Sequence, residues 1–252
     1  NNTFSLNLGL ASLIQNPKFA DFKKLTQPQA LPVTNLRSLV PINTGGSKAP
    51  LFCFHGVGGN VMNYVALIPA VDGKRPLYGV QSRGLDGKEP FVESIEEMAR
   101  CYVAEIRQVQ PHGPYLLAGG SMGGTVAFEV AQQLLAVGES IQNIIMFDTF
   151  GPDVEIKIPD PVDHSLFRRL KVAFFHRLKV LSIELRKALL NVNLQKVPLD
   201  IILFELEQAN YRTLRKYQPK SYSGNICIIR ARLQEKGWYS DPFMGCRKVV
   251  KG

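Results

Sequence analysis

The sequence predicts an α/β fold: a mostly parallel sheet with helices on both of its faces. Five short apolar runs have the length of buried strands, and segments with helical periodicity lie between them. Strands that are apolar throughout are buried on both faces, and parallel strands joined by helical crossovers produce that burial. With 252 residues, 45% of them apolar, the chain is long enough for one large domain with its own core.

The elements follow a weakly patterned start. Residues 1–36 are polar, and we expect a linker or an N-terminal arm there. A first strand is predicted at 38–43, and the apolar runs lie at 51–54, 77–80, 115–118, 144–147 and 226–229. Ahead of the run at 115–118, apolar residues from Ile95 to Val109 recur at helical spacing, which predicts a crossover helix.

The alternation of strands and helices breaks between about residue 152 and residue 215. Two helical segments fill this stretch, and between Ser165 and Leu190 there are seven Lys and Arg residues against one Glu. In the first helix, an apolar stripe lies on one side and mostly basic residues lie on the opposite side. The stripe consists of Leu170, Phe174, Leu178, Leu181, Leu185 and Leu189. We expect an amphipathic helical insertion, which fits either a lid over a site or a helix lying on a membrane surface.

Composition excludes several classes of protein. The net charge of +9 is not interleaved with aromatic residues in a recognisable module, so we expect no nucleic-acid partner. Cys53, Cys101, Cys227 and Cys246 are scattered without metal-site spacing, which indicates reduced thiols and no metal. There is no 18-residue uncharged apolar run, no signal peptide and no initiator Met. We therefore expect a soluble, cytoplasmic domain excised from a longer polypeptide.

One stretch, "YLLAGGSMGGTVAFEVAQQL", places a serine among glycines where a strand gives way to a helix. Gly119, Ser121 and Gly123 fit G-x-S-x-G, in which a sharp turn brings strand and helix so close that only glycine fits on either side. The turn exposes the Ser121 hydroxyl and directs the Met122 N–H toward the same point. A lone G-x-S-x-G also occurs by chance in glycine-rich loops, so the interpretation depends on its context.

The segment "FCFHGVGGN" ends an earlier strand and predicts a second glycine-rich turn. Such a turn would supply the other oxyanion donor, for which we favour the Val57 N–H. A phosphate-binding loop is the alternative, but neither nucleotide-binding glycine pattern is present. His55 lies on the oxyanion side, so we interpret it as a structural hydrogen-bonding residue and not as a base.

In "IIMFDTFGP", Asp148 ends the strand that follows the serine's helix. A carboxylate there faces the same sheet edge as Ser121 and can orient an imidazole, although a turn or helix-cap Asp is the alternative. Chain order then requires a histidine after a later strand. The four histidines are His55, His112, His164 and His176, and none follows the run at 226–229.

These motifs together resemble the thioesterase domains that end nonribosomal peptide synthetase and polyketide synthase assembly lines. The motifs are "PLFCFHGVGGN", "PLYGVQSRGLDG", the serine-containing stretch and "IIMFDTFGP". The resemblance implies an α/β-hydrolase fold over residues 37–252 with a lid at about 152–215, ending before the family's histidine segment. By analogy, Ser121 is the nucleophile, Asp148 the acid, and the N–H groups of Val57 and Met122 the oxyanion hole. The family position of the insertion favours the lid over a membrane-surface helix.

The resemblance also implies the substrate and partner. An acyl or peptidyl chain would arrive as a thioester on the phosphopantetheine of a carrier protein domain, with no cofactor bound to this chain. Hydrolysis or macrocyclisation through a Ser acyl-enzyme would release it. Two alternatives stay open: a free-standing esterase or lipase of the same fold, and a non-catalytic binding module that lacks the base.

Overall fold

The computed structural model describes residues 36–151, 180–183, 198–231, 244–247 and 249. The arm at 1–35 and most of the insertion, at 152–179 and 184–197, lie outside the described residues. Within the insertion, residues 180–183 are helical, as predicted. There Ile183 is buried and Leu181, which we placed on the apolar stripe, is 56% exposed.

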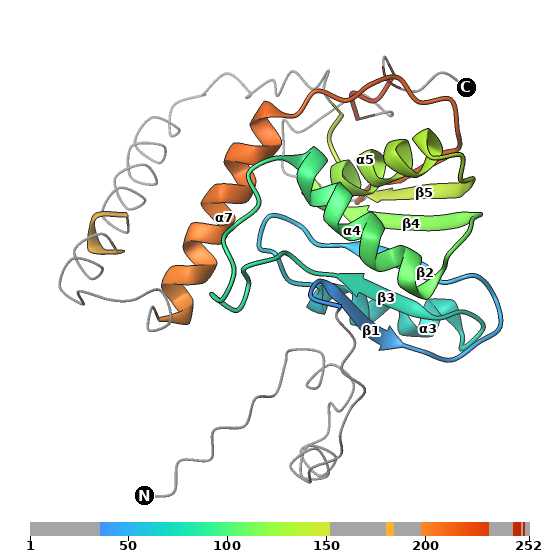
Figure 1. Cartoon of the computed structure of the whole chain (residues 1–252), viewed down its shortest axis with the longest axis horizontal. Helices are drawn as coiled ribbons and strands as arrows, with labels where there is room; N and C mark the ends of the chain where they lie inside the picture. Colours follow the sequence, from blue (N-terminus) through green and yellow to red (C-terminus); the bar gives the residue numbers. More distant parts are fainter. Residues whose placement is uncertain (1–35, 152–179, 184–197, 232–243, 248, 250–252) are drawn as a thin grey trace, which may run out of the picture.

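Six described strands form one sheet in the order β1-β3-β2-β4-β5-β6 (Figure 1). All neighbours are parallel except β1, which pairs antiparallel with β3 at the edge. The predicted, mostly parallel sheet is therefore confirmed. The strands are β1 (Leu39–Asn43), β2 (Leu51–Phe54), β3 (Leu77–Val80), β4 (Tyr115–Gly120), β5 (Ile141–Phe147) and β6 (Ile226–Ile229).

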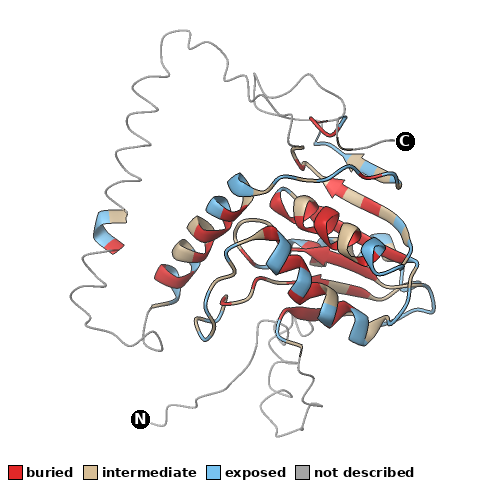
Figure 2. Cartoon of the chain, turned by 45° about the horizontal axis from the view of Figure 1, so that its top comes forward, coloured by how far each residue is buried: buried red, intermediate tan, exposed pale blue. Residues whose placement is uncertain are grey.

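Helices cover both faces of the sheet. On one face lie α4 (Ile95–Val109) and α5 (Met122–Ala136), and on the other lie the 3-10 helix η1 (Met62–Leu67) and α3 (Ile68–Val71). Alternate residues of the central strands supply the two cores: Phe52 and Phe54 of β2 face the α4 and α5 side, whereas Leu51 and Cys53 face the η1 side. Figure 2 shows the buried residues concentrated in the sheet and in the facing sides of these helices.

The helix α4 begins where the sequence pattern predicts. The Ser94 side chain accepts the Glu97 N–H at 3.1 Å and so caps its first turn, which also holds two acidic residues that favour the positive end of the helix dipole. Its buried side chains include Ile95, Met98, Tyr102 and Ile106.

A further helix, α7 (Leu199–Lys216), lies across the carboxyl ends of the parallel strands (Figure 1). The carboxyl edge of a parallel sheet is where the loops after the strands converge, so α7 forms one wall of whatever site these loops build. Among the described residues, no helix combines the length and apolar character that crossing a membrane requires. The same residues contain no cluster of His, Cys, Asp or Glu side chains suited to a metal ion.

Candidate functional site

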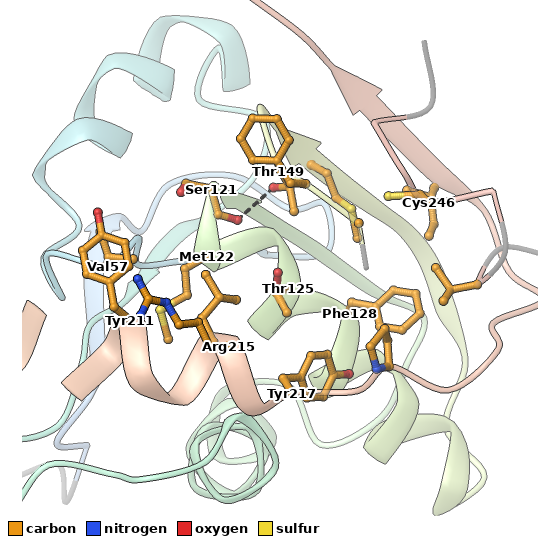
Figure 3. Close-up of a pocket in the computed structure, with 17 residues that line it drawn as sticks. Val57, Ser121, Met122, Thr125, Phe128, Thr149, Tyr211, Arg215, Tyr217 and Cys246 are labelled. Carbon is orange, nitrogen blue, oxygen red and sulfur yellow. Dashed lines mark hydrogen bonds between the residues drawn. The ribbon is translucent and has the colours of Figure 1, made fainter. Parts of the chain in front are cut away.

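Ser121 occupies the turn between β4 and α5 with φ 53° and ψ −124°. A non-glycine residue holds such a conformation only where its surroundings enforce it. Here both of its peptide groups are bonded: its N–H donates to the Phe147 carbonyl at 2.9 Å, and its carbonyl accepts from the Thr149 Oγ1 at 3.0 Å (Figure 3). The turn thus fixes the backbone and leaves the side chain exposed.

The flanking glycines meet the close approach that the motif predicts. A Cβ at Gly119 would lie 2.1 Å from the carbonyl carbon of Gly123, and one at Gly123 would lie 2.2 Å from the Phe54 oxygen. No side chain fits at either position because both clashes are with backbone atoms. The second of these contacts also brings the start of α5 against the end of β2, where the next glycine-rich turn begins.

His55 holds that second turn in place. Its Nδ1 lies 2.7 Å from the Gly56 oxygen and its Nε2 2.8 Å from the Tyr102 hydroxyl. Because a carbonyl only accepts, Nδ1 carries the proton and donates, and Nε2 accepts from Tyr102. Burial lowers the pKa of His55 to about 4, so the ring is neutral near pH 7. This agrees with the structural role that we predicted for it.

The bonds to Gly56 also orient the predicted oxyanion donor at Val57. The Gly56 oxygen accepts a second hydrogen bond, from the Gly59 N–H at 3.0 Å. In a trans peptide the N–H points opposite to the carbonyl, so the Val57 N–H points away from His55. On the other side, the buried Asn210 of α7 donates from Nδ2 to the Val57 oxygen at 2.8 Å.

Tyr64 of η1 joins the ends of β2 and β4. Its hydroxyl donates to the Phe54 oxygen at 2.5 Å and accepts the Gly120 N–H at 2.9 Å. Phe54 immediately precedes the turn that holds Val57, and Gly120 immediately precedes Ser121. The buried Tyr64 hydroxyl therefore bridges the two strands at the point where they diverge.

Ser121, Met122 and Val57 line one cavity of about 580 Å³ (Figure 3). As the first residue of α5, Met122 contributes one of the N–H groups that a helix leaves without an intrahelical partner. The remaining wall is mostly apolar and aromatic, with contributions from α5, α7 and the segment after β5. It includes Phe128, Met146, Phe150, Tyr211, Leu214 and Tyr217. A second cavity, of about 680 Å³, lies beside Asn60 and Leu203 and does not include Ser121.

Asp148 lies directly after β5, at the same sheet edge as Ser121. Gly120 pairs with Phe147 in the register of β4 and β5, so the two residues follow paired positions. The Asp148 Oδ1 accepts the Ala231 N–H at 2.8 Å, beyond the end of β6. Asp148 is not among the described residues that line the cavity. Its role as the acid stays a prediction.

Neither histidine in the described part of the chain is placed to serve Ser121. His55 is buried on Tyr102, and His112 bonds Glu139 near the start of β4, at the opposite edge of the sheet. His164 and His176 lie outside the described residues.

Sequence reasoning missed the polar residues that support the site. Tyr64, Thr149 and Asn210 each bond a backbone group of one of the two turns. Thr149 directly follows Asp148, and this adjacency is a weak sequence signal that Thr149 lies near the site. Nothing in the sequence indicates Tyr64 or Asn210, because their partners are backbone atoms distant along the chain.

The fold and the strand-turn-helix site together define the structural class of this protein. A doubly covered, mostly parallel sheet with a serine at a sharp turn after a central strand is an α/β-hydrolase fold. A model of the thioesterase domain family matches residues 49–168, the part of the chain that contains the strand-turn-helix site.

The matched relatives are synthetases. The chain is 31% identical over 242 residues to malpinin synthetase and 38% identical over 168 residues to malpibaldin synthetase, both from Mortierella alpina. These matches cover 91% and 66% of this chain, respectively, but only 3% of each synthetase. The chain thus corresponds to a small part of these relatives.

Solved structures show the same fold. The four-domain nonribosomal peptide synthetase holo-AB3403 matches with a TM-score of 0.64 and 26% identity, over 84% of this chain and 18% of that chain. The NocB thioesterase domain, in covalent complex with a fluorophosphonate nocardicin G analogue, matches with a TM-score of 0.53 and 23% identity, over 73% of each chain.

Proposed function

We propose that this chain releases an acyl or peptidyl chain from the phosphopantetheine of a carrier protein domain, through an acyl-enzyme on Ser121. One observation carries the proposal. Ser121 is held at an enforced turn and opens into the same cavity as Met122 and Val57, whose N–H groups we propose as the two oxyanion donors. The family supports the thioester as the bond that is broken.

In the first step the Ser121 oxygen attacks the thioester carbonyl. A carbon–oxygen bond forms, and the negative charge that develops on the carbonyl oxygen is stabilised by the N–H groups of Val57 and Met122. The carbon–sulfur bond then breaks, and the pantetheine thiol leaves with the proton that Ser121 gave up. A histidine oriented by Asp148 would carry that proton, by analogy with the family.

In the second step an acceptor attacks the acyl-enzyme. Water gives a free acid, and a nucleophile on the acyl chain itself gives a ring. The cavity wall is mostly apolar and aromatic, which suits an acyl chain extended from Ser121 along α5 and α7. This wall favours a chain of appreciable size over a short acyl group.

A binding module without catalysis is the second candidate, because neither described histidine lies beside Ser121. Reaction of the serine separates the two. We expect a fluorophosphonate, the probe class that NocB holds covalently, to add one adduct to the wild-type chain and none to Ser121→Ala, as measured by intact mass.

The acyl thioester is tested in the same way. A phosphopantetheine thioester should leave an acyl adduct on the wild-type chain and outcompete a simple ester of the same acid, whereas a free-standing esterase would prefer the ester. A chain that takes no adduct from either reagent would contradict the proposal and favour the binding module.

A further inference from the structure

The cavity beside Ser121 contains one charged side chain among its described lining residues. Arg215 of α7 contributes it, whereas the remaining lining residues are apolar, aromatic, small or carry hydroxyl or thiol groups. Figure 3 shows Arg215 on the same wall as Tyr211, which precedes it by one turn of α7. A guanidinium that is the single charge among the described lining residues is an anion-binding feature.

Arg215 has no hydrogen bond or ion pair with any described residue, and its side chain is exposed to solvent. Tyr217, two residues later, differs: its hydroxyl donates to Glu129 Oε2 at 2.7 Å. A basic residue in the last turn also favours the helix dipole, but Lys216 serves that end equally and does not line the cavity. The dipole therefore does not explain why a cation faces the cavity.

The occupant of the cavity changes the surroundings of Arg215. With the cavity filled by solvent, water bonds the guanidinium. An apolar acyl chain would displace water from the side of the guanidinium that faces the cavity and offer no acceptor in its place, which costs free energy. An acyl chain that carries its own carboxylate restores the bonds, and the planar guanidinium binds a carboxylate through two parallel hydrogen bonds. A chain that carries a carboxylate is therefore the better complement to this wall.

We propose that Arg215 selects acyl chains that carry a carboxylate distant from the thioester, so that the substrate is the half-thioester of a dicarboxylic acid or an acidic peptidyl chain. This inference rests on the proposed function and names its substrate class. Arg215 acts here as a substrate-binding residue and takes no part in the bond changes at Ser121.

The test measures binding, so that it does not depend on turnover. The ligands are ketone isosteres of the N-acetylcysteamine half-thioesters of succinic, glutaric and adipic acid, in which a methylene stands in place of the thioester sulfur. Each has a matched analogue with a terminal carboxamide in place of the carboxylate. None contains phosphate, so binding of a pantetheine phosphate does not contribute. We expect calorimetry to show that at least one carboxylate binds about tenfold more tightly than its carboxamide.

Variants of Arg215 and Lys216 show which residue causes the preference for the carboxylate. Arg215→Ala should remove the preference for the carboxylate, Arg215→Lys should keep part of it, and Lys216→Ala, on the same turn but outside the cavity, should keep all of it. Equal binding of carboxylate and carboxamide in the wild type, a preference that survives Arg215→Ala, or no binding of any analogue would overturn the inference.

Fluorophosphonate labelling of Ser121 in the same proteins separates the two proposals. Labelling without a charge preference contradicts only the role of Arg215. A charge preference without labelling contradicts the thioesterase function and leaves an anion-binding cavity.

Discussion

Tyr64 contributes no chemistry to the predicted reaction, yet its hydroxyl bridges the two strand ends that precede the predicted oxyanion donors. Tyr64→Phe would leave the Phe54 oxygen and the Gly120 N–H without this partner inside the protein. We expect it to lower the free energy of unfolding by about 2 kcal/mol. We also expect fluorophosphonate labelling of Ser121 to slow by about tenfold, because the two donors lose their fixed separation.

Tyr222→Phe is the matched control. Tyr222 is also buried and packs on Phe128, but its hydroxyl has no partner among the described residues. Removing that hydroxyl should leave stability and labelling unchanged. If Tyr64→Phe loses stability in denaturant titrations but labels at the wild-type rate, its hydroxyl is structural only and does not position the predicted oxyanion donors.

Individual residues differ in how far the sequence predicts their roles. Ser121 and its glycines are local in the chain, so the turn they form can be inferred from a few neighbouring letters. The partner of Asn210 is the Val57 oxygen, 153 positions away, and no local pattern encodes such a contact. The neutral state of His55 was equally hidden, because it follows from burial against Tyr102.

At the scale of the elements, the two adjacent glycines at the turn from β4 into α5 should differ in how much stability an alanine substitution costs. Gly119→Ala places a Cβ 2.1 Å from the carbonyl carbon of Gly123, whereas the nearest atoms to a Cβ at Gly120 lie at 3.7 Å. We expect Gly119→Ala to destabilise the domain by about 3 kcal/mol or to prevent its folding. The neighbouring Gly120→Ala should cost less than about 1 kcal/mol.

Thermal and denaturant unfolding of the two alanine variants measure this difference. Gly120 serves as the control because it is adjacent, belongs to the same strand and undergoes the same substitution. Similar stability of both variants would show that strand and helix separate easily, and the enforced conformation of Ser121 would then lack its support.

The helix α7 was predicted only as the second helical part of the insertion. Hydrophobic periodicity predicted that a helix forms, but not where it packs. Its position depends on contacts with distant turns: a Cβ at Gly59 would lie 2.5 Å from Leu206, and one at Gly87 would lie 2.5 Å from Ile202. Such packing against glycines leaves no pattern in the sequence of the helix itself.

At the scale of the whole molecule, the sheet was predictable because each buried strand is a short apolar run. The run at 51–54, for example, became β2 with both faces buried. The direction of β1 was not predictable, since an edge strand of "LVPIN" carries no signal of whether it pairs parallel or antiparallel.

The stability of the folded domain should depend on pH through His55. Its pKa is about 4 in the folded state and about 6.5 in an unfolded chain. Between these values the unfolded state binds more protons, so stability is lost as the pH falls from 6.5 to 4 and changes no further below that. For this group alone we expect a loss of about 3 kcal/mol.

Denaturant titrations at pH 7.5 and 4.5 measure this loss. Other acid-sensitive groups contribute in the wild type, so the comparison is with His55→Asn, which retains a polar side chain and cannot titrate. Between the two pH values the variant should lose less free energy of unfolding than the wild type. The reason is that its unfolding takes up about one proton fewer, the proton that His55 binds in the unfolded wild type. Parallel pH profiles for the two proteins would contradict the buried, neutral state of His55.

The hydrogen bond from Asn210 to the Val57 oxygen couples the position of α7 to the conformation of the turn that holds Val57. A ligand that binds more tightly when Val57 is held in place must, to the same degree, favour the docked position of α7. A partner that displaces α7 must weaken binding at the turn by an equal factor. If the proposed function holds, this reciprocity predicts that an acyl chain bound along α7 and the charge that develops at its carbonyl strengthen each other's binding.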